Sequence, residues 1–289
     1  MDSRNLKQRI KPLARKIIGS LRLCPWLPIL QRLDPRTLGA YPPPVQIEVV
    51  AVDGQFRKLR FNRKHEVWFP EQTPINAELW SEYLCVFWPH RTNGHYYLKK
   101  HTPIRPGDIA VDCGACEGFF VLQALAAEAA QVICLEPSSV MVECLQRTFK
   151  PEIAAGKVVV VQAAAGAAEG ITHFHFDSQM PFGGKAQKDA PGQPVRVATL
   201  ASLCRELNLP RVDFIKMDIE GAETQAVEGA LPVLNRYFPR LAITTYHRAF
   251  DYAALRVLLM AAGYRHIQPA GLTDRGEGVS RPVMIHGWN

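Results

Sequence analysis

The segment from Asp108 to Phe120, DIAVDCGACEGFF, constrains the fold more than any other stretch of this 289-residue chain. An apolar run leads to Asp112, then to the small residues between Gly114 and Gly118, and then to an apolar helical pattern. The two glycines can adopt backbone angles closed to other residues, so a ligand can approach the main chain. A buried strand that turns tightly into a helix is typical of the ligand-binding edge of a parallel α/β sheet. The G-x-x-x-G spacing differs from the G-x-G-x-x-G of dinucleotide folds.

A second acidic residue favours a nucleoside ligand over a pyrophosphate. The next predicted strand, Gln131 to Leu135, ends at Glu136, about 20 residues past the turn, where a carboxylate binds ribose hydroxyls in dinucleotide folds. Asp112 and Glu136 then lie at the carboxyl ends of adjacent strands. S-adenosylmethionine carries a ribose and a cationic tail, and therefore suits a site whose fixed charges are acidic. The alternative is an ordinary strand-to-helix turn that binds nothing.

Strand and helix patterns alternate from Asp108 to the end of the chain. We expect further strands at 157–162, 212–217, 241–245, 264–268 and 283–286, and helices at 119–130, 138–149, 199–207, 222–237 and 252–262. Residues 177–194 are rich in glycine and proline and predict a loop, after a hairpin through 171–176. Alternation of this kind predicts a parallel sheet with helices on both faces. Asp112, Glu136, Asp218 and His247 all fall at its ligand-binding edge.

The first 36 residues are basic and predict an amphipathic helix that ends before Pro25. This helix either caps the main domain, which we favour, or lies on an anionic membrane or partner surface. Its short apolar run excludes a secretory signal, and no segment approaches the length of a membrane span. The seven cysteines are odd in number, which favours reduced thiols and a cytoplasmic location. Cys113 and Cys116 form a C-x-x-C without the second pair that a zinc site requires.

Residues 45 to 69 contain two alternating segments separated by Asp53-Gly54, a hairpin signal. The aromatic residues between 74 and 98 either line a substrate entrance or form a core against the main domain. We therefore divide the chain into an N-terminal region, 1–100, and a main domain, 101–289. The net charge of +7 would suit a nucleic acid, but much of the excess lies in 1–36 and 57–64.

Two motifs resemble the FkbM-type family of S-adenosylmethionine-dependent methyltransferases. VDCGACEG, residues 111–118, is similar to the family's VDVGANxG turn, and VDFIKMDIEGAETQAVEGA, residues 212–230, is similar to its longer second signature. AITTYHRAFD resembles the strand-end Tyr-His with a following Asp. The resemblance covers roughly residues 95 to 289, the size of one domain. Cys116 replaces the usual Asn, which puts one polar cofactor contact in question, and Ala201 replaces an Asp at a helix start that Thr199 can cap.

The resemblance implies an α/β, class I (Rossmann-like) methyltransferase fold. Its seven-stranded, mostly parallel sheet has an antiparallel last strand and helices on both faces, with a small N-terminal region added. It also implies S-adenosyl-L-methionine as cofactor, S-adenosyl-L-homocysteine as product, and O-methylation of a sugar, a glycan or a secondary metabolite such as a polyketide. The expected cofactor-binding residues are Asp112, Gly114, Ala115, Cys116, Gly118, Glu136, Pro137, Ser138, Gln162, Ala163 and Asp218.

Methyl transfer to an alcohol requires little from the protein beyond positioning the acceptor and receiving its proton. His247, at a strand end on the expected active edge, is our candidate general base, alone or with Asp218 and Glu220. Lys216 belongs to the same cluster. Alternatively, Asp218, Glu220 and His247 bind magnesium or manganese that polarises the hydroxyl.

Two other functions compete with O-methylation. A nucleic-acid (RNA) base methyltransferase carries an Asn/Asp-Pro-Pro-aromatic turn after its fourth strand, where this chain has Asp218-Ile219-Glu220-Gly221, and this difference argues against it. A protein that binds the cofactor without transferring the methyl group is the second alternative. Formation of S-adenosylhomocysteine distinguishes it from an enzyme.

Overall fold

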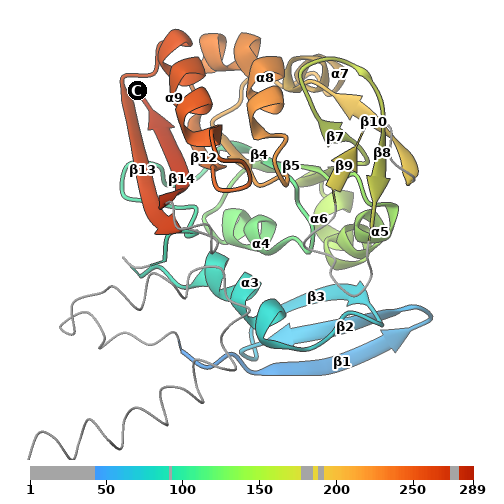
Figure 1. Ribbon diagram of the computed structural model, residues 1–289. Coiled ribbons are helices and arrows are strands. Elements are labelled where there is room, and N and C mark those ends of the chain that lie inside the picture. Colours follow the sequence, from blue (N-terminus) through green and yellow to red (C-terminus); the bar gives the residue numbers. More distant parts are fainter. Residues whose placement is uncertain (1–42, 91–92, 177–184, 188–191, 274–279) are drawn as a thin grey trace, which may run out of the picture.

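The computed structural model describes residues 43–90, 93–176, 185–187, 192–273 and 280–289 (Figure 1). Within them, seven strands form a central sheet in the order β13-β14-β12-β11-β4-β5-β6. Their bounds are β4 Ile109–Cys113, β5 Gln131–Leu135, β6 Val158–Val161, β11 Phe214–Met217, β12 Arg240–Thr244, β13 His266–Thr273 and β14 Arg281–Trp288. Strand β14 is antiparallel to both of its neighbours, and all other neighbouring pairs are parallel. The predicted mostly parallel, seven-stranded sheet is confirmed.

Helices cover both faces of the central sheet (Figure 1). One face carries α4 Phe119–Ala126, α5 Ser139–Thr148 and α6 Lys150–Ala154; the other carries α7 Leu200–Glu206, α8 Glu223–Tyr237 and α9 Asp251–Ala261. Because side chains alternate along a strand, Ala110 packs into one core while Val111 packs into the other. The central strands between these two cores are mostly apolar, with the charged residues Asp112 and Lys216 near their ends, and this pattern is why they could be predicted from sequence.

Most predicted elements match the structure, and the differences have local causes. The helix expected to reach residue 130 ends at Ala126, because Glu128 adopts a left-handed φ of 61° that no helix can continue through. Thr199 caps α7 as predicted, since its hydroxyl oxygen accepts the N–H of Ser202 at 3.0 Å. The last two strands are longer than expected and pair with each other along most of their length.

A second, four-stranded sheet has the order β7-β10-β8-β9. Its strands are β7 Ala164–Ala165, β8 Gly170–His175, β9 Lys185–Gln187 and β10 Gln193–Ala198. The predicted loop at 177–194 was therefore wrong where β9 forms and where β10 begins, while 177–184 and 188–191 lie outside the described residues. Pairing with β8 supplies the backbone hydrogen bonds there, and this tertiary contact overrides the low strand propensity of glycine and proline.

The N-terminal region forms a three-stranded antiparallel sheet of β1 Ile47–Asp53, β2 Phe56–Phe61 and β3 His65–Pro70. The predicted hairpin at Asp53-Gly54 is confirmed. The second predicted segment is two strands rather than one, because Asn62 and Arg63 take φ values of 49° and 57° and reverse the chain. Helix α3, Ala77–Phe87, was not predicted, although Asn76 caps it through the N–H groups of residues 78 and 79. The helix expected within residues 1–36 lies outside the described residues.

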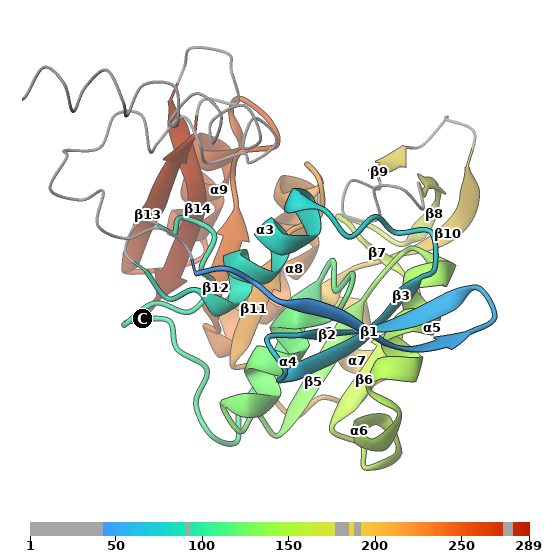
Figure 2. The same cartoon turned by 90° about the horizontal axis from the view of Figure 1, so that it is seen from below.

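This N-terminal sheet lies against α4 and α5, on their side away from the central sheet (Figures 1 and 2). Phe119, the first residue of α4, is fully buried and meets Phe61, Tyr83 and Phe87 with ring centroids 5.0, 5.4 and 6.0 Å away. The backbone N–H of Trp68 also donates to the hydroxyl of Thr148 on α5 at 2.9 Å. One apolar core therefore spans both sides of residue 100. The division of the chain into two parts at that residue stays a prediction.

Two general expectations concern the setting of the protein. Among the described helices, none combines the length and the apolar character needed to cross a bilayer. Among the described residues, the cysteines at 85, 113, 116, 134, 144 and 204 form no disulfide with one another.

The aromatic contacts of Phe119 predict its contribution to stability. Replacing Phe119 with Ala should lower the free energy of unfolding by about 3 to 5 kcal/mol, because it empties a buried ring site between two layers. Urea unfolding followed by circular dichroism measures this change. The matched control is Phe250→Ala, whose ring is 81% exposed and whose loss should change stability by less than about 0.5 kcal/mol. Equal effects of the two substitutions would contradict the idea that Phe119 stabilises the packing of the N-terminal region on α4.

Candidate active site

A buried ion pair lies where β4 and β11 end. The ammonium of Lys216 is 2.9 Å from the Oδ1 of Asp112 and donates to the carbonyl oxygen of Gly114 at 2.6 Å. Burial alone would lower the pKa of Lys216, but the charges of Asp112 and Asp218 raise it above its usual value. Lys216 therefore remains charged at neutral pH, and it links strands β4 and β11 to the turn after β4.

The turn after β4 requires a glycine and one further left-handed residue. Gly114 has a φ of 78°, and a Cβ there would lie 2.0 Å from the carbonyl oxygen of Asp218. Cys116 has a φ of 43°, a conformation that asparagine tolerates best among residues with a Cβ. This explains the Asn usual at this position, and it shows that Cys116 preserves the backbone geometry without the amide.

Glu136, after β5, is held by two backbone donors. Its Oε2 accepts the N–H of Cys116 and its Oε1 accepts the N–H of Ser138, each at 2.9 Å. The residue is 5% exposed, and burial raises its pKa to about 7 in spite of these hydrogen bonds. Each oxygen keeps a free lone pair, so the carboxylate can also accept two ligand hydroxyls.

An apolar pocket lies beside Glu136. Leu135, Pro137, Ala163, Phe174 and Ile219 line it together with that carboxylate. Its lining is mostly apolar, with the acids Glu136, Asp218 and Glu220 at its edges, and such a mixture suits a purine nucleoside. We call this hollow the apolar pocket.

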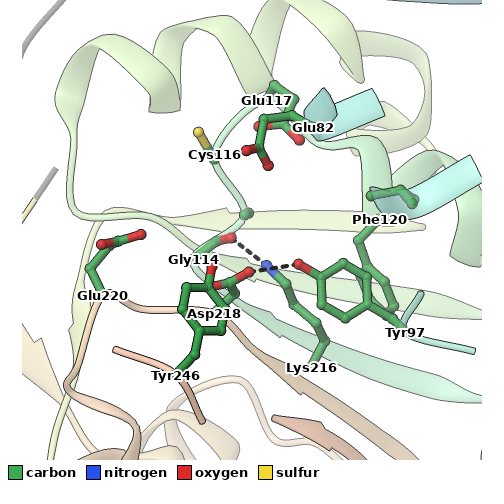
Figure 3. A pocket seen from close by; sticks show the side chains of 12 residues that line it. Glu82, Tyr97, Gly114, Cys116, Glu117, Phe120, Lys216, Asp218, Glu220 and Tyr246 are labelled. Carbon is green, nitrogen blue, oxygen red and sulfur yellow. Dashed lines mark hydrogen bonds between the residues drawn. The ribbon is translucent and has the colours of Figure 1, made fainter. Parts of the chain in front are cut away.

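A second hollow, the acidic pocket, lies next to it. Its polar lining residues are Glu82, Tyr97, Cys116, Glu117, Lys216, Asp218, Glu220 and Tyr246 (Figure 3). The two pockets share Gly114, Cys116, Asp218 and Glu220. A ligand in the apolar pocket could therefore reach a second ligand in the acidic pocket across this turn.

Asp218 stands at the junction of the pockets. Its Oδ2 accepts the hydroxyl of Tyr97 at 2.8 Å, and its Oδ1 accepts that of Thr244 at 3.2 Å. Burial would raise the pKa of Asp218, but the charges of His247 and Lys216 lower it below its usual value. Glu220 follows in the left-handed region with a φ of 55°, a strained backbone typical of functional sites.

His247 lies behind this turn, among three carboxylates. Its Nδ1 is 2.8 Å from Glu223, and its Nε2 is 3.3 Å from Glu220 and 3.6 Å from Asp218. Burial of the ring would lower its pKa, but the hydrogen bonds and charges of these acids raise it to about 10. The imidazole is therefore protonated at neutral pH and has no lone pair with which to accept a proton. A general base must start as the neutral ring, so the role that we expected for His247 requires loss of this proton and stays a prediction.

The same state bears on the metal alternative. Ligand atoms of Asp218, Glu223 and His247 lie within 4.8 Å of one another, with Glu223 in the place that we expected for Glu220. A metal would have to displace the imidazole proton, because only the neutral ring coordinates. The Oε1 of Glu223 also accepts the N–H of Ile219 and the hydroxyl of Thr244, each at 3.0 Å. An ion-pair network accounts for the contacts of Oε1, whereas Oε2 of Glu223 is buried without a hydrogen bond to the part of the chain that the structure describes.

The structure brings together most of the residues expected in the site. Nine of them line a pocket: Gly114, Ala115, Cys116, Glu136, Pro137, Ala163, Lys216, Asp218 and Glu220. Five expected residues line neither pocket. Asp112 is buried below the turn, Gly118 packs on Phe149, and Ser138 caps α5. Gln162 is exposed, and His247 lies behind Asp218. Glu82 and Glu117 line the acidic pocket and were missed. Glu117 lies inside the predicted turn, whereas nothing in the sequence around Glu82 indicates a site.

Comparisons with known proteins identify the family of this chain. The family model described as Methyltransferase FkbM domain matches residues 112–266. A solved methyltransferase FkbM from Methylobacillus flagellatus is 24% identical, covers 63% of this chain and 44% of its own, and has a TM-score of 0.48. The precorrin-6y C5,15-methyltransferase of Geobacter metallireducens is 13% identical, covers 64% and 81%, and has a TM-score of 0.39. No curated protein matches the sequence.

The surroundings of His247 predict how stability depends on pH. Its pKa rises from 6.5 to about 10 on folding, so its contribution is complete below pH 6.5 and is lost as the pH rises through 10. His247→Gln should lower the free energy of unfolding by roughly 3 kcal/mol at pH 6, because it leaves buried acids without their cation. Urea unfolding at pH 6 and pH 10 should show a smaller difference from wild type at the higher pH. A difference independent of pH would mean that the imidazole is neutral.

Proposed function

Because this chain belongs to the FkbM methyltransferase family, we propose that it transfers a methyl group from S-adenosylmethionine to a hydroxyl of a sugar, glycan or secondary metabolite. One observation carries the proposal: an apolar pocket with a carboxylate at its edge meets an acidic pocket at Gly114 and Asp218. The first suits a nucleoside cofactor, and the second suits an acceptor. Their shared turn is the place where the two would react.

The residues around the apolar pocket fit the cofactor. Glu136 would hold the ribose hydroxyls with the lone pairs that Cys116 and Ser138 leave free. Leu135, Phe174 and Ile219 would cover the adenine. Asp218 and Glu220 add negative charge where the cationic end of the cofactor would lie, which favours its binding. When bound, the cofactor supplies an electrophilic methyl group on a good leaving group.

The remaining predicted residues position this site. Lys216 ties the Gly114 turn to Asp112 and so keeps the floor of both pockets in place. His247 acts as a positioning cation, with its two ring nitrogens close to the carboxyl groups of Asp218, Glu220 and Glu223. We favour this role over that of general base. With the acceptor held against the turn, positioning supplies much of the rate acceleration.

The charge of the acidic pocket favours a neutral acceptor with several hydroxyls. Carboxylates accept hydrogen bonds from hydroxyl groups, and they repel phosphates. Glu82, Glu117, Asp218 and Glu220 line this pocket, and Lys216, its one cationic side chain, is occupied by Asp112. A nucleic acid would have to bring its phosphates close to these acids. The pocket therefore supports a sugar-like acceptor over RNA.

Mass spectrometry tests this function. Metabolites and glycans from cells with and without the gene should differ by a product with one added methyl group. Incubation of the purified protein with labelled S-adenosylmethionine and an extract of the gene-deleted cells should yield S-adenosylhomocysteine and a labelled product. Cofactor binding without either product would instead support a binding protein that transfers no methyl group.

The position of Glu136 predicts its contribution to cofactor affinity. Glu136→Ala should weaken binding of S-adenosylmethionine by roughly 1.5 to 3 kcal/mol, the scale of a hydrogen bond to a charged group. Isothermal titration calorimetry measures the change. Glu143→Ala is the matched control, since its carboxylate is on α5 and partly exposed beside Arg147. An unchanged affinity of the Glu136 variant would remove the ribose assignment.

A further inference from the structure

Two glutamates, Glu82 and Glu117, line the acidic pocket. Glu82 comes from α3 and Glu117 comes from the turn after β4, and Figure 3 shows their carboxyl groups next to each other. Glu117 is 8% exposed, and the thiol of Cys116 and its own backbone N–H donate to it. Neither glutamate forms an ion pair with a cation within the described part of the chain. These two side chains are the pocket's acids without a counterion.

The other two acids of the pocket are already engaged. Asp218 accepts hydrogen bonds from Tyr97 and Thr244 and lies near His247, which lowers its pKa. Glu220 lies 3.3 Å from the imidazolium of His247. A carboxylate held by a cation is a weak base, because taking a proton would break the ion pair. Glu82 and Glu117 are therefore better placed than Asp218 and Glu220 to accept the proton of the acceptor hydroxyl.

The pKa shifts of the two glutamates suit groups that accept a proton near neutral pH. Burial raises the pKa of Glu117 to about 7, and burial together with the charge of Glu117 raises the pKa of Glu82 well above its usual value. Glu82 therefore keeps its proton to a higher pH than an ordinary carboxyl group, while Glu117 ionises near neutral pH. The charged or titratable groups that act on the pair are Glu78, Asp112, Cys116, Lys216, Asp218 and Glu220.

We propose that Glu82 and Glu117 are the proton acceptor for the methylated hydroxyl, with Glu117 as the base and Glu82 as its protonated hydrogen-bond partner. This inference rests on the proposed methyl transfer. The acceptor oxygen bonds to the methyl carbon as the carbon–sulfur bond breaks and its electron pair stays on sulfur. The hydroxyl proton passes to Glu117, which then releases it to solvent. A base with a pKa near the working pH is the most effective for this step.

The inference also assigns the N-terminal region a part in the reaction. Helix α3 lies outside residues 112–266, the part that matches the family model. Glu117 occupies the variable position of the VDVGANxG turn, so neither member of the pair belongs to a family motif. The acceptor side of this enzyme is therefore completed by a segment that differs from the cofactor-binding domain.

The experiment compares Glu117→Gln and Glu82→Gln with Glu78→Gln, which removes an acid one turn earlier on the same helix and does not line the pocket. Methyl incorporation is measured from labelled S-adenosylmethionine into an extract of gene-deleted cells, between pH 5.5 and 9. We expect Glu117→Gln to lower the rate by about 10² or more and to remove its rise through neutral pH. Glu82→Gln should lower it less, and Glu78→Gln should stay within about twofold of wild type.

Two readouts do not depend on turnover. Calorimetry should give Glu117→Gln a wild-type affinity for S-adenosylhomocysteine, because its side chain faces the acceptor pocket. Infrared titration of the carboxylic acid band should show one group fewer titrating near pH 7 in Glu117→Gln, with Glu136 still present, and no loss in Glu78→Gln. Gln is close in shape to Glu, and circular dichroism spectra of the three variants should show that each is folded.

The outcomes separate the two proposals. Wild-type protein that incorporates no label into the extract would overturn the proposed function, and the base with it. If the wild-type protein is active and Glu117→Gln has the same rate, Glu117 is not the base, but the proposed methyl transfer stands. A slowed Glu117→Gln variant that keeps the neutral-range titration would also overturn it, because another group would then be the one that ionises.

Discussion

A single buried lysine fixes the geometry on which the rest of the site depends. Lys216 extends from β11 to Asp112 on the neighbouring strand and to the carbonyl of Gly114, with the ring of Tyr97 5.3 Å from its ammonium. Burying two charges is costly, and this cost is offset only while both partners are present and hydrogen-bonded. The pair therefore allows only one position for the turn, and both pockets take their shape from that turn.

The sheet and the cofactor edge were predictable because their signals are local. Strands buried on both faces are continuously apolar, and the small residues around Gly114 can serve few purposes other than a close backbone approach. Glu136 could be predicted because it directly follows a strand of this kind. Right-handed crossovers limit how parallel strands can be ordered, but the order of the strands in space was not predicted from the sequence.

The chemistry of the acceptor side could not be predicted in this way. His247 looked like a base because a histidine ordinarily titrates near neutral pH, but three acids from separate parts of the turn and α8 keep it protonated. Glu82 reaches the pocket from a helix whose sequence has no motif. Cys116 looked like a lost polar contact, although the constraint at that position is on φ. Each of these properties arises from tertiary contacts that no short pattern contains.

The pairing of β4 with β11 has a consequence for how the chain is made. Gly114 leaves the ribosome 102 residues before Lys216, which holds it in the folded protein. At the usual speed of synthesis, roughly 5 to 20 residues per second, the edge of β4 stays unpaired for about 5 to 20 s. During that interval β4, β5 and β6 can associate, but the acid in β4 has no counterion and its open edge can pair with other chains. The newly made amino-terminal half is thus the form of this protein that most needs a chaperone.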